Sequence, residues 1–278
     1  MKHYTYPAVL TIAGSDPSGG AGIQADLKTF SALGCYGMSV ITALTAQNTL
    51  GVTGIHSIPP HFVAEQLETL LQDITPLAIK IGMVHTPQLA GVIADCLLQF
   101  PNIPVVLDPV MIATSGDRLI ENETVAAIIQ KLFPLATVIT PNMDEAALLA
   151  GTPVTSVADM QAAGKTILGL DTNAVLVKGG HLPSEQLTSL LFTSQSHRVT
   201  EYTSQKIATK NMHGSGCTLS SAIAACLALG DALPQAVQKA QDYVHGAILH
   251  GADVITGKGH GPLNHFYNPQ TLKKHELE

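Results

Sequence analysis

The chain has 278 residues, of which 46% are hydrophobic and only 13% are charged, so most of it must pack inside a globular fold. Its net charge of −7 argues against a nucleic-acid partner, which would require a basic face. No apolar run reaches the roughly 18 residues of a membrane span, and the N-terminus has no signal-peptide pattern. The four cysteines lack CxxC spacing, which is typical of reduced thiols in a cytoplasmic protein.

Short β-branched runs alternate with amphipathic helical stretches through most of the chain. Strands are predicted at 8–13, 38–46, 78–83, 105–110, 137–142 and 174–179. Helical spacing lies between them, as where Ile23, Leu27 and Phe30 share a face before Gly34 ends the helix. An antiparallel pair at 187–193 and 198–207 follows, and then two helices at 216–229 and 234–250.

Strands that alternate with helices require an α/β fold whose sheet is mainly parallel and covered on both faces. The chain shows no linker, repeat or low-complexity segment, so one domain is predicted over residues 1–276. Residues 277–278 are left out of this domain as a candidate vector-derived tail.

Polar or glycine-rich segments follow the predicted strands at their carboxyl ends. In an open parallel sheet these ends form the ligand crevice. Turn chemistry explains any one such segment alone, but six that converge on one edge predict a binding site. They lie at 14–22, 47–48, 82–83, 108–110, 141–145 and 178–181.

Two nucleotide-binding motifs are excluded. The run from Gly20 to Ala25 matches G-x-G-x-x-A, but a dinucleotide site also needs an acidic residue about 20 positions later, and none occurs between Asp26 and Glu65. The segment 164–166 resembles the end of a P-loop, but it lies within a helical pattern and lacks the first glycine of that motif.

The segment Gly214-Ser215-Gly216-Cys217 stands directly before an apolar helix. Glycines at a helix start allow backbone N–H groups to approach an anion, and the helix dipole favours negative charge there. This pattern predicts an anion hole for a phosphoryl group in transfer, a reaction that depends mainly on positioning and charge neutralisation.

Three charged residues complete the predicted phosphoryl-transfer site. Asp108 and Glu145 are interpreted as carboxylates that hold Mg²⁺ directly or through water, and Lys178 as a point charge for the nucleotide phosphates. The alternatives are helix capping for the two carboxylates and a surface salt bridge for Lys178.

Cys217 is placed where the acceptor hydroxyl needs a base. The helix N-terminus is expected to lower the pKa of its thiol from about 8.5, so that a thiolate is available near neutral pH. The alternative is a small buried hydrophobe. His213 adjoins the anion loop and is a further candidate, whereas Cys35, Cys96 and Cys226 are interpreted as packing residues.

Nine motifs cover nearly the whole chain: AGSD (13–16), SGGAGIQAD (18–26), TALTAQNT (42–49), KIGM (80–83), DPVM (108–111), PNMDE (141–145), VKGGH (177–181), HGSGCTLS (213–220) and GHGPLN (259–264). In combination they resemble the hydroxymethylpyrimidine/phosphomethylpyrimidine kinases of thiamine biosynthesis. The chain departs from that pattern at Met212, where a threonine is expected before His213, and at Ser215, where threonine is common.

The resemblance implies a ribokinase-like, three-layer α/β/α domain that is commonly a homodimer. It implies two ATP- and Mg²⁺-dependent steps, from hydroxymethylpyrimidine to its monophosphate and then to the diphosphate. It assigns the pyrimidine pocket to Gly14, Ala21, Gln47, Met83, Val110 and Cys217, the metal to Asp108 and Glu145, and the nucleotide phosphates to Lys178. Asn142 and His213 are further candidates for nucleotide binding. A carboxamide such as Gln47 independently suits an aminopyrimidine, because it offers one acceptor and two donors.

Two other functions remain open from the sequence. A pyridoxal or pyridoxine kinase would share the fold and the anion hole, whereas sugar and nucleoside kinases of this fold usually carry Asp at the position of Cys217. A non-catalytic sensor with Cys217 as a redox switch is less consistent with the sequence, because a sensor need not keep Asp108, Glu145 and Lys178.

Overall fold

The computed structural model describes residues 2–111, 120–180 and 182–277. His181, from the predicted site segment 178–181, and Glu278, from the excluded tail, lie outside the described residues. Near the two ends of the chain, β1 (Tyr4–Thr5) and β11 (His275–Glu276) pair as a short antiparallel ribbon.

The other strands of the described residues form one nine-stranded sheet in the order β10-β9-β8-β7-β6-β5-β2-β3-β4. The six strands from β8 to β3 in that order are parallel, and antiparallel partners flank them on both sides. The strands are β2 (Ala8–Ser15), β3 (Tyr36–Asn48), β4 (Gly51–Ser57), β5 (Ala78–Ile81), β6 (Val105–Leu107), β7 (Val138–Ile139), β8 (Ala174–Val177), β9 (Gln186–Thr193) and β10 (Ser196–Gln205).

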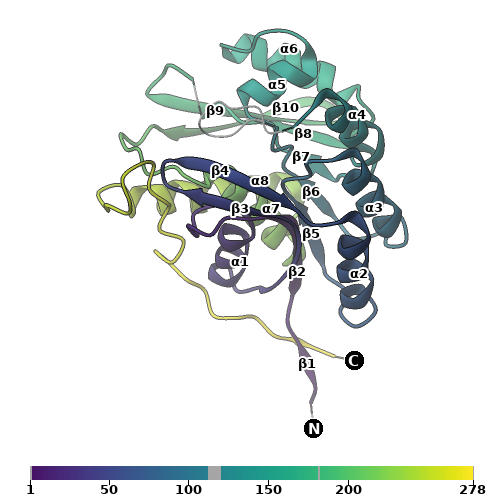
Figure 1. Cartoon of the computed structure of the whole chain (residues 1–278). Coiled ribbons are helices and arrows are strands. Elements are labelled where there is room, and N and C mark those ends of the chain that lie inside the picture. Colours follow the sequence, from purple (N-terminus) through teal and green to yellow (C-terminus); the bar gives the residue numbers. More distant parts are fainter. Residues whose placement is uncertain (1, 112–119, 181, 278) are drawn as a thin grey trace.

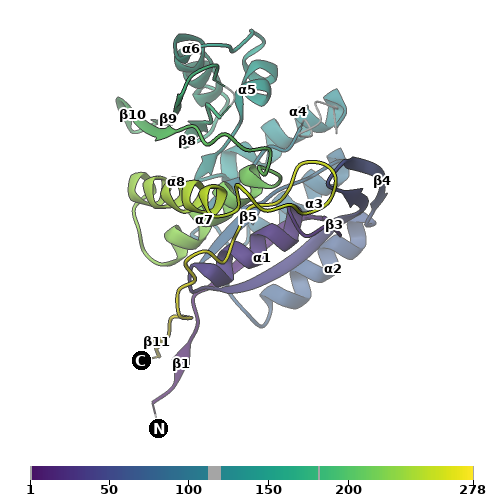
Figure 2. The same cartoon turned by 90° about the vertical axis from the view of Figure 1, so that its left-hand side faces the viewer.

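Helices cover both faces of the sheet (Figures 1 and 2). One layer contains α1 (Gly22–Ala32), α7 (Ser215–Ala228) and α8 (Leu233–Leu249). The opposite layer contains α2 (Pro60–Leu71), α3 (Pro87–Leu97), α4 (Asn122–Lys131), α5 (Met143–Ala150) and α6 (Val157–Leu168), with the short 3₁₀ helix η1 (Phe133–Leu135) after α4. The predicted three-layer α/β/α fold with a mainly parallel sheet is therefore confirmed.

The central strands are apolar on both faces because each face is covered. Alternate residues of a strand point to opposite sides, so Val9 and Ala78 pack toward the α1/α7/α8 layer, whereas Leu10 and Ile79 pack toward the other. A charged side chain inside these strands is therefore unusual, because it is buried whichever face it points to.

The strand order reverses its direction between β2 and β5. From β2 the chain moves outward to β3 and β4, and from β5 it moves the opposite way through β6, β7 and β8. Ligands of open α/β sheets bind at the carboxyl ends of the strands beside such a switch point. The fold therefore places its crevice near the ends of β2 and β5.

Two differences from the sequence prediction bear on the site. Four predicted strands end earlier than expected, at Ile81, Leu107, Ile139 and Val177, because the polar residues that follow leave the sheet. The sequence analysis also missed β4, which pairs with the end of β3. Across the described residues, no helix combines the length and apolarity needed to cross a membrane.

Candidate active site

A cavity of about 720 Å³ lies at the carboxyl ends of the parallel strands. It brings together the carboxyl ends of β2 and β3, the segments that follow β2, β5, β6, β7 and β8, and the start of α7. All the site residues predicted from the sequence line it: Gly14, Ala21, Gln47, Met83, Asp108, Val110, Asn142, Glu145, Lys178, His213, Gly214, Ser215, Gly216 and Cys217.

The start of α7 has the geometry of an anion site. Its N-cap is Gly214, which has a φ of 83° and offers no side chain to cap the first turn. A Cβ at this position would collide with the carbonyl oxygen of Gly20, so only glycine fits. The 14-residue helix therefore directs its N-terminal dipole into the cavity without a capping side chain.

An ion pair faces this helix start. Lys178 Nζ lies 2.9 Å from Asp108 Oδ1, and Thr140 Oγ1 donates to the same oxygen at 3.0 Å. A Cβ at Gly216 would lie 3.4 Å from Lys178 Nζ and 3.6 Å from Asp108 Oδ2, so glycine allows the helix to approach the pair. The anion site and the predicted phosphate-binding lysine are thus adjacent.

Lys178 and Asp108 each stabilise the ionised form of the other. Burial opposes ionisation of Asp108, but Lys178 and then Lys80 hold the pKa of its carboxyl below the usual range. Burial likewise opposes the Lys178 cation, yet Asp108 and Glu145 raise its pKa. Both groups are therefore charged at neutral pH, and Lys178 is not the surface salt bridge considered as its alternative, since its side chain is only 14% exposed.

Glu145 and Asn142 cap α5, as the alternative interpretation of Glu145 anticipated. Asn142 Oδ1 accepts from the Glu145 backbone N–H, and Glu145 Oε2 accepts from the Asn142 backbone N–H, both at 2.8 Å. Glu145 Oε1 accepts from the Met111 N–H at 3.3 Å. Burial and the charge of Asp108 outweigh the opposing charge of Lys178 and together raise the pKa of Glu145 to about 7.

Cys217 occupies the first turn of α7, where it is partly buried. Its sulfur accepts a hydrogen bond from the Gly22 N–H, and burial raises the pKa of the thiol to about 11. The positive charge of Lys80 lowers this pKa, but Asp26 and Asp108 raise it. The expected thiolate near neutral pH is therefore wrong for this structure, because desolvation and two carboxylates outweigh the Lys80 cation and the Gly22 N–H.

The acceptor side of the cavity is built around Gln47. His213 Nε2 lies 2.8 Å from Asp16 Oδ2 and 3.5 Å from Gln47 Nε2. Met83 lies against Gly14, where a Cβ would be 3.4 Å from the Met83 sulfur. The ring of His213 thus contacts Asp16 and the predicted acceptor residue Gln47, rather than Lys178 on the nucleotide side to which the sequence analysis assigned it.

Sequence reasoning missed one wall of the cavity. It is formed by α8, whose residues Gln241, Val244, His245 and Ile248 recur at helical spacing. The Nε2 atoms of Gln241 and His245 are buried and have no hydrogen-bond partner within the described part of the chain. The sequence signal was an ordinary amphipathic helix, which gave no reason to separate these residues from core positions.

Comparisons with known proteins identify the family of this chain. A sequence model of the family described as phosphomethylpyrimidine kinase matches residues 16–264. The chain is 49% identical over 259 residues to a hydroxymethylpyrimidine/phosphomethylpyrimidine kinase of Rhizobium meliloti, and the match covers 93% of this chain and 96% of that protein.

Solved structures share the fold. A phosphomethylpyrimidine kinase from Clostridium difficile superposes with a TM-score of 0.76 at 45% identity, covering 87% of this chain and 99% of that one. A Staphylococcus aureus pyridoxal kinase in complex with AMP-PCP gives a TM-score of 0.87 at 34% identity, covering 98% of this chain and 100% of that one.

The higher sequence identity to the pyrimidine kinases favours the predicted thiamine-pathway kinase over the pyridoxal kinase alternative. It also confirms the prediction of an enzyme. The matched family model and these relatives together show that the chain belongs to the phosphomethylpyrimidine kinase family.

Proposed function

We propose that this chain transfers the γ-phosphoryl group of ATP to hydroxymethylpyrimidine and then to its monophosphate, which yields the diphosphate used in thiamine biosynthesis. The observation that carries this proposal is the meeting, in one cavity, of an uncapped helix start, a buried Lys178–Asp108 pair and the acceptor-side residues around Gln47. Phosphoryl transfer asks for this combination of anion binding and orientation.

The acceptor is proposed to lie between Gln47, Met83 and Val110. The carboxamide of Gln47 can both donate and accept hydrogen bonds, which matches the amino group and ring nitrogen of an aminopyrimidine. Met83 and Val110 offer apolar surfaces for a flat ring. Gly14 and Ala21, which also line the cavity, leave room for the ring because they lack large side chains.

The nucleotide is proposed to extend from Lys178 toward α8. Lys178 supplies a positive charge for the phosphates beside Asn142. The N–H groups of Gly216 and Cys217 surround the transferred phosphoryl group, because the Ser215 N–H already donates to the Met212 carbonyl at 3.1 Å. At the far end, the buried and unpartnered Nε2 atoms of Gln241 and His245 fit a polar heterocycle such as adenine.

Asp108 and Glu145 are proposed to serve one Mg²⁺ site. Although no cluster of three or more ligating side chains occurs in the described ranges, Mg²⁺ keeps several waters and takes one or two protein carboxylates. The buried Asp108 carboxylate, which raises the proton affinity of Glu145, also favours a cation beside the two groups. When bound, Mg²⁺ neutralises phosphate charge, and Asp108 and Lys178 orient the groups around it.

Mg²⁺ binding is expected to strengthen between about pH 6 and pH 8. The pKa of Glu145 is raised from 4.5 to about 7, so between these values the folded protein holds a proton that the unfolded chain releases. This contribution to stability is fully present below about pH 4.5 and is lost as pH rises to about 7. A cation that replaces the proton therefore binds better above pH 7. Isothermal titration of Mg²⁺ at both pH values measures the difference.

The matched control is Asp159→Asn, because Asp159 occupies the same capping-box position in α6 away from the cavity. Glu145→Gln should abolish the pH dependence of Mg²⁺ affinity, whereas Asp159→Asn should leave it intact. If the pH dependence of Mg²⁺ affinity were unchanged in Glu145→Gln, the role of Glu145 would be limited to capping α5.

Cys217 is proposed to take the proton of the acceptor hydroxyl. It lies in the helix turn that holds the phosphoryl group, so an in-line acceptor must bring its hydroxyl to this side chain. Because the pKa of the thiol is about 11, only a small fraction is ionised at pH 8, but that thiolate is a strong base. A dissociative transition state requires the base only late in the reaction.

The two-step function is tested by identifying products. Incubation with hydroxymethylpyrimidine and excess ATP-Mg²⁺ should yield the monophosphate first and the diphosphate later, as resolved by ³¹P NMR. Accumulation of the monophosphate alone would contradict the second step, and no phosphorylated product would contradict the proposal as a whole.

The location and assembly of the enzyme are also proposals. The four cysteines are free and none forms a disulfide, which supports a reducing cytoplasmic compartment. The resemblance supports a homodimer, which sedimentation equilibrium of the purified protein would test.

A further inference from the structure

Lys80 is a charged residue in the centre of the sheet that the proposed reaction does not use. It lies in β5, where its neighbours are Ala78, Ile79 and Ile81, and its side chain is 0% exposed. By strand alternation it shares the face of Ala78 and points toward α1 and α7. A buried charge is unfavourable unless it is paired.

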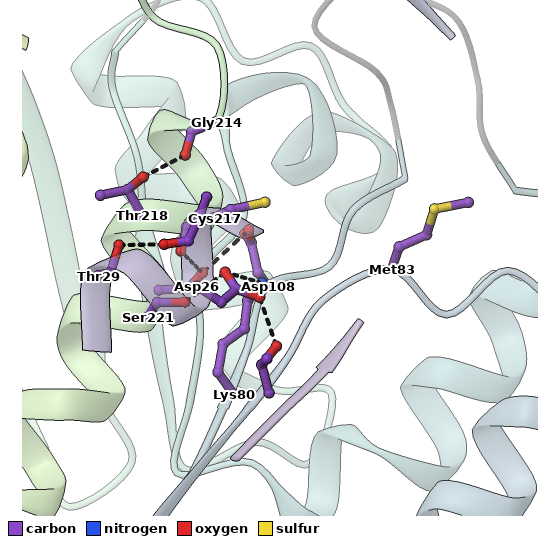
Figure 3. A network of polar contacts seen from close by, with 12 residues as sticks. Asp26, Thr29, Lys80, Met83, Asp108, Gly214, Cys217, Thr218 and Ser221 are labelled. Carbon is purple, nitrogen blue, oxygen red and sulfur yellow. Dashed lines mark hydrogen bonds and ion pairs between the residues drawn. The ribbon is translucent and has the colours of Figure 1, made fainter. Parts of the chain in front are cut away.

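Asp26 of α1 provides the pair and joins four elements. Lys80 Nζ lies 2.8 and 3.0 Å from its two carboxylate oxygens. Thr11 of β2 donates to Asp26 at 2.6 Å, and Ser221 of α7 donates to it at 2.7 Å. Figure 3 shows this network below the turn of α7 that carries Cys217.

The network is tied directly to the reacting end of α7. Ser221 follows Cys217 by four residues, so both lie on the same face of the helix. The bond from Ser221 to Asp26 therefore fixes the depth and rotation of the turn that holds the anion site. Because Asp26 is held in turn by Lys80 and Thr11, the two strands beside the switch point set the position of α7.

Lys80 also reaches toward the chemistry. Its Nζ lies at the carboxyl end of β5, where a Cβ on Gly82 would be only 2.8 Å away, and the residue lines the cavity. The charged groups that act on Cys217 there are Lys80, Lys178, Asp26 and Asp108, and the Lys80 cation favours the thiolate against both carboxylates.

We propose that the buried Lys80–Asp26 pair is a positioning element for phosphoryl transfer, which fixes the first turn of α7 and holds a permanent positive charge beneath Cys217. Stability alone is a poor explanation, because a buried ion pair is often replaced by apolar residues without loss of stability. The inference rests on the proposed function. That function is tested separately in the same assay, by whether the wild-type protein phosphorylates hydroxymethylpyrimidine.

The test uses the double variant Lys80→Met/Asp26→Asn, which removes both charges. The carboxamide oxygen can still accept from one of Thr11 and Ser221, and its NH2 group can donate to the hydroxyl oxygen of the other. Lys80→Gln provides a second form that removes only the cation. Each variant is assayed for kcat and for KM of ATP. Iodoacetamide modification of Cys217 at about pH 8.5 is followed by peptide mass spectrometry, with the buried Cys226 as internal reference.

In both variants kcat should fall at least about tenfold with little change in KM for ATP. In Lys80→Gln, which keeps Asp26, alkylation of Cys217 should slow about tenfold for each unit of pKa increase, whereas in the double variant the loss of Asp26 offsets part of this effect. Ser221→Ala, which keeps the charges, should lower kcat while alkylation keeps its wild-type rate.

Thr29→Val is the matched control, since Thr29 is buried one turn later in α1 and donates to the Ala25 carbonyl rather than to Asp26. It should change neither kcat nor the alkylation rate. A folded Lys80→Gln variant whose Cys217 alkylates at the wild-type rate would overturn the proposal, whatever its kcat.

Discussion

Cys217→Ser is expected to lower kcat by about 10²–10⁴-fold, the range that general-base catalysis usually contributes. The first turn of α7 is proposed to hold the phosphoryl group, which would place the side chain at position 217 within reach of the hydroxyl that attacks it. A serine hydroxyl is a far weaker base than a thiolate, whereas the backbone N–H groups of the anion site are unchanged. KM for ATP should therefore change little.

The pH dependence of kcat distinguishes a catalytic base at Cys217 from a side chain that only lines the pocket. Because burial raises the pKa of Cys217 to about 11, wild-type kcat should still increase with pH above about pH 8. Cys217→Asp, which supplies a carboxylate base, should recover activity near neutral pH and lose that increase. Alkylation of wild-type Cys217 should require a higher pH than a free thiol does, and bound acceptor should slow it.

Cys226→Ser is the matched control, because Cys226 lies on the same helix but is buried in the core. It should retain wild-type kcat. If Cys217→Ser also retained wild-type kcat, Cys217 would be only a wall of the pocket, and the anion site would carry the chemistry alone.

Asp108→Asn is expected to lower kcat by about 10²–10³-fold, as removal of one group that stabilises charge in a transition state commonly does. The substitution keeps the shape of the side chain, and its one oxygen can still accept from Thr140 or Ser220. It removes the charge that pairs with Lys178 and that is proposed to serve Mg²⁺. The Mg²⁺ concentration for half-maximal rate should therefore rise.

Steady-state rates across a Mg²⁺ titration measure both effects, and circular dichroism shows whether the fold is retained. An Mg²⁺ requirement that is unchanged in both Asp108→Asn and Glu145→Gln would exclude these carboxylates from the metal site. Their role would then be limited to the ion pair with Lys178 and the cap of α5.

The sequence was sufficient to predict where the site lies. Each parallel strand changes abruptly from apolar to polar or glycine-rich residues. The carboxyl ends of parallel strands meet at one edge of the sheet, which predicts that Asp108, Asn142 and Lys178 are neighbours. The anion site was predicted for a similar reason, since Gly214 and Gly216 precede an apolar helix.

What the sequence could not supply depends on contacts between distant residues. Asp26 and Lys80 are 54 positions apart, and nothing local to either residue shows that they pair. The same holds for Cys217, whose expected low pKa followed from its helix position alone. Its raised pKa comes from burial and from carboxylates on other elements. β4 was missed because Gly51 and Gly54 interrupt its strand pattern and its residues are largely exposed.

The central claim, an aminopyrimidine kinase with Gln47 as the recognition residue, is tested most directly by comparing kcat/KM for hydroxymethylpyrimidine and pyridoxal in wild type and Gln47→Leu. Pyridoxal lacks the amino group beside the ring nitrogen and would leave part of the half-buried Gln47 carboxamide covered by the ring but unpaired. Such a loss costs about 1–3 kcal/mol, or about 5- to 150-fold. We predict that wild type prefers hydroxymethylpyrimidine by a factor in this range and that Gln47→Leu loses the preference. A wild-type kcat/KM for pyridoxal equal to or above that for hydroxymethylpyrimidine would contradict the account.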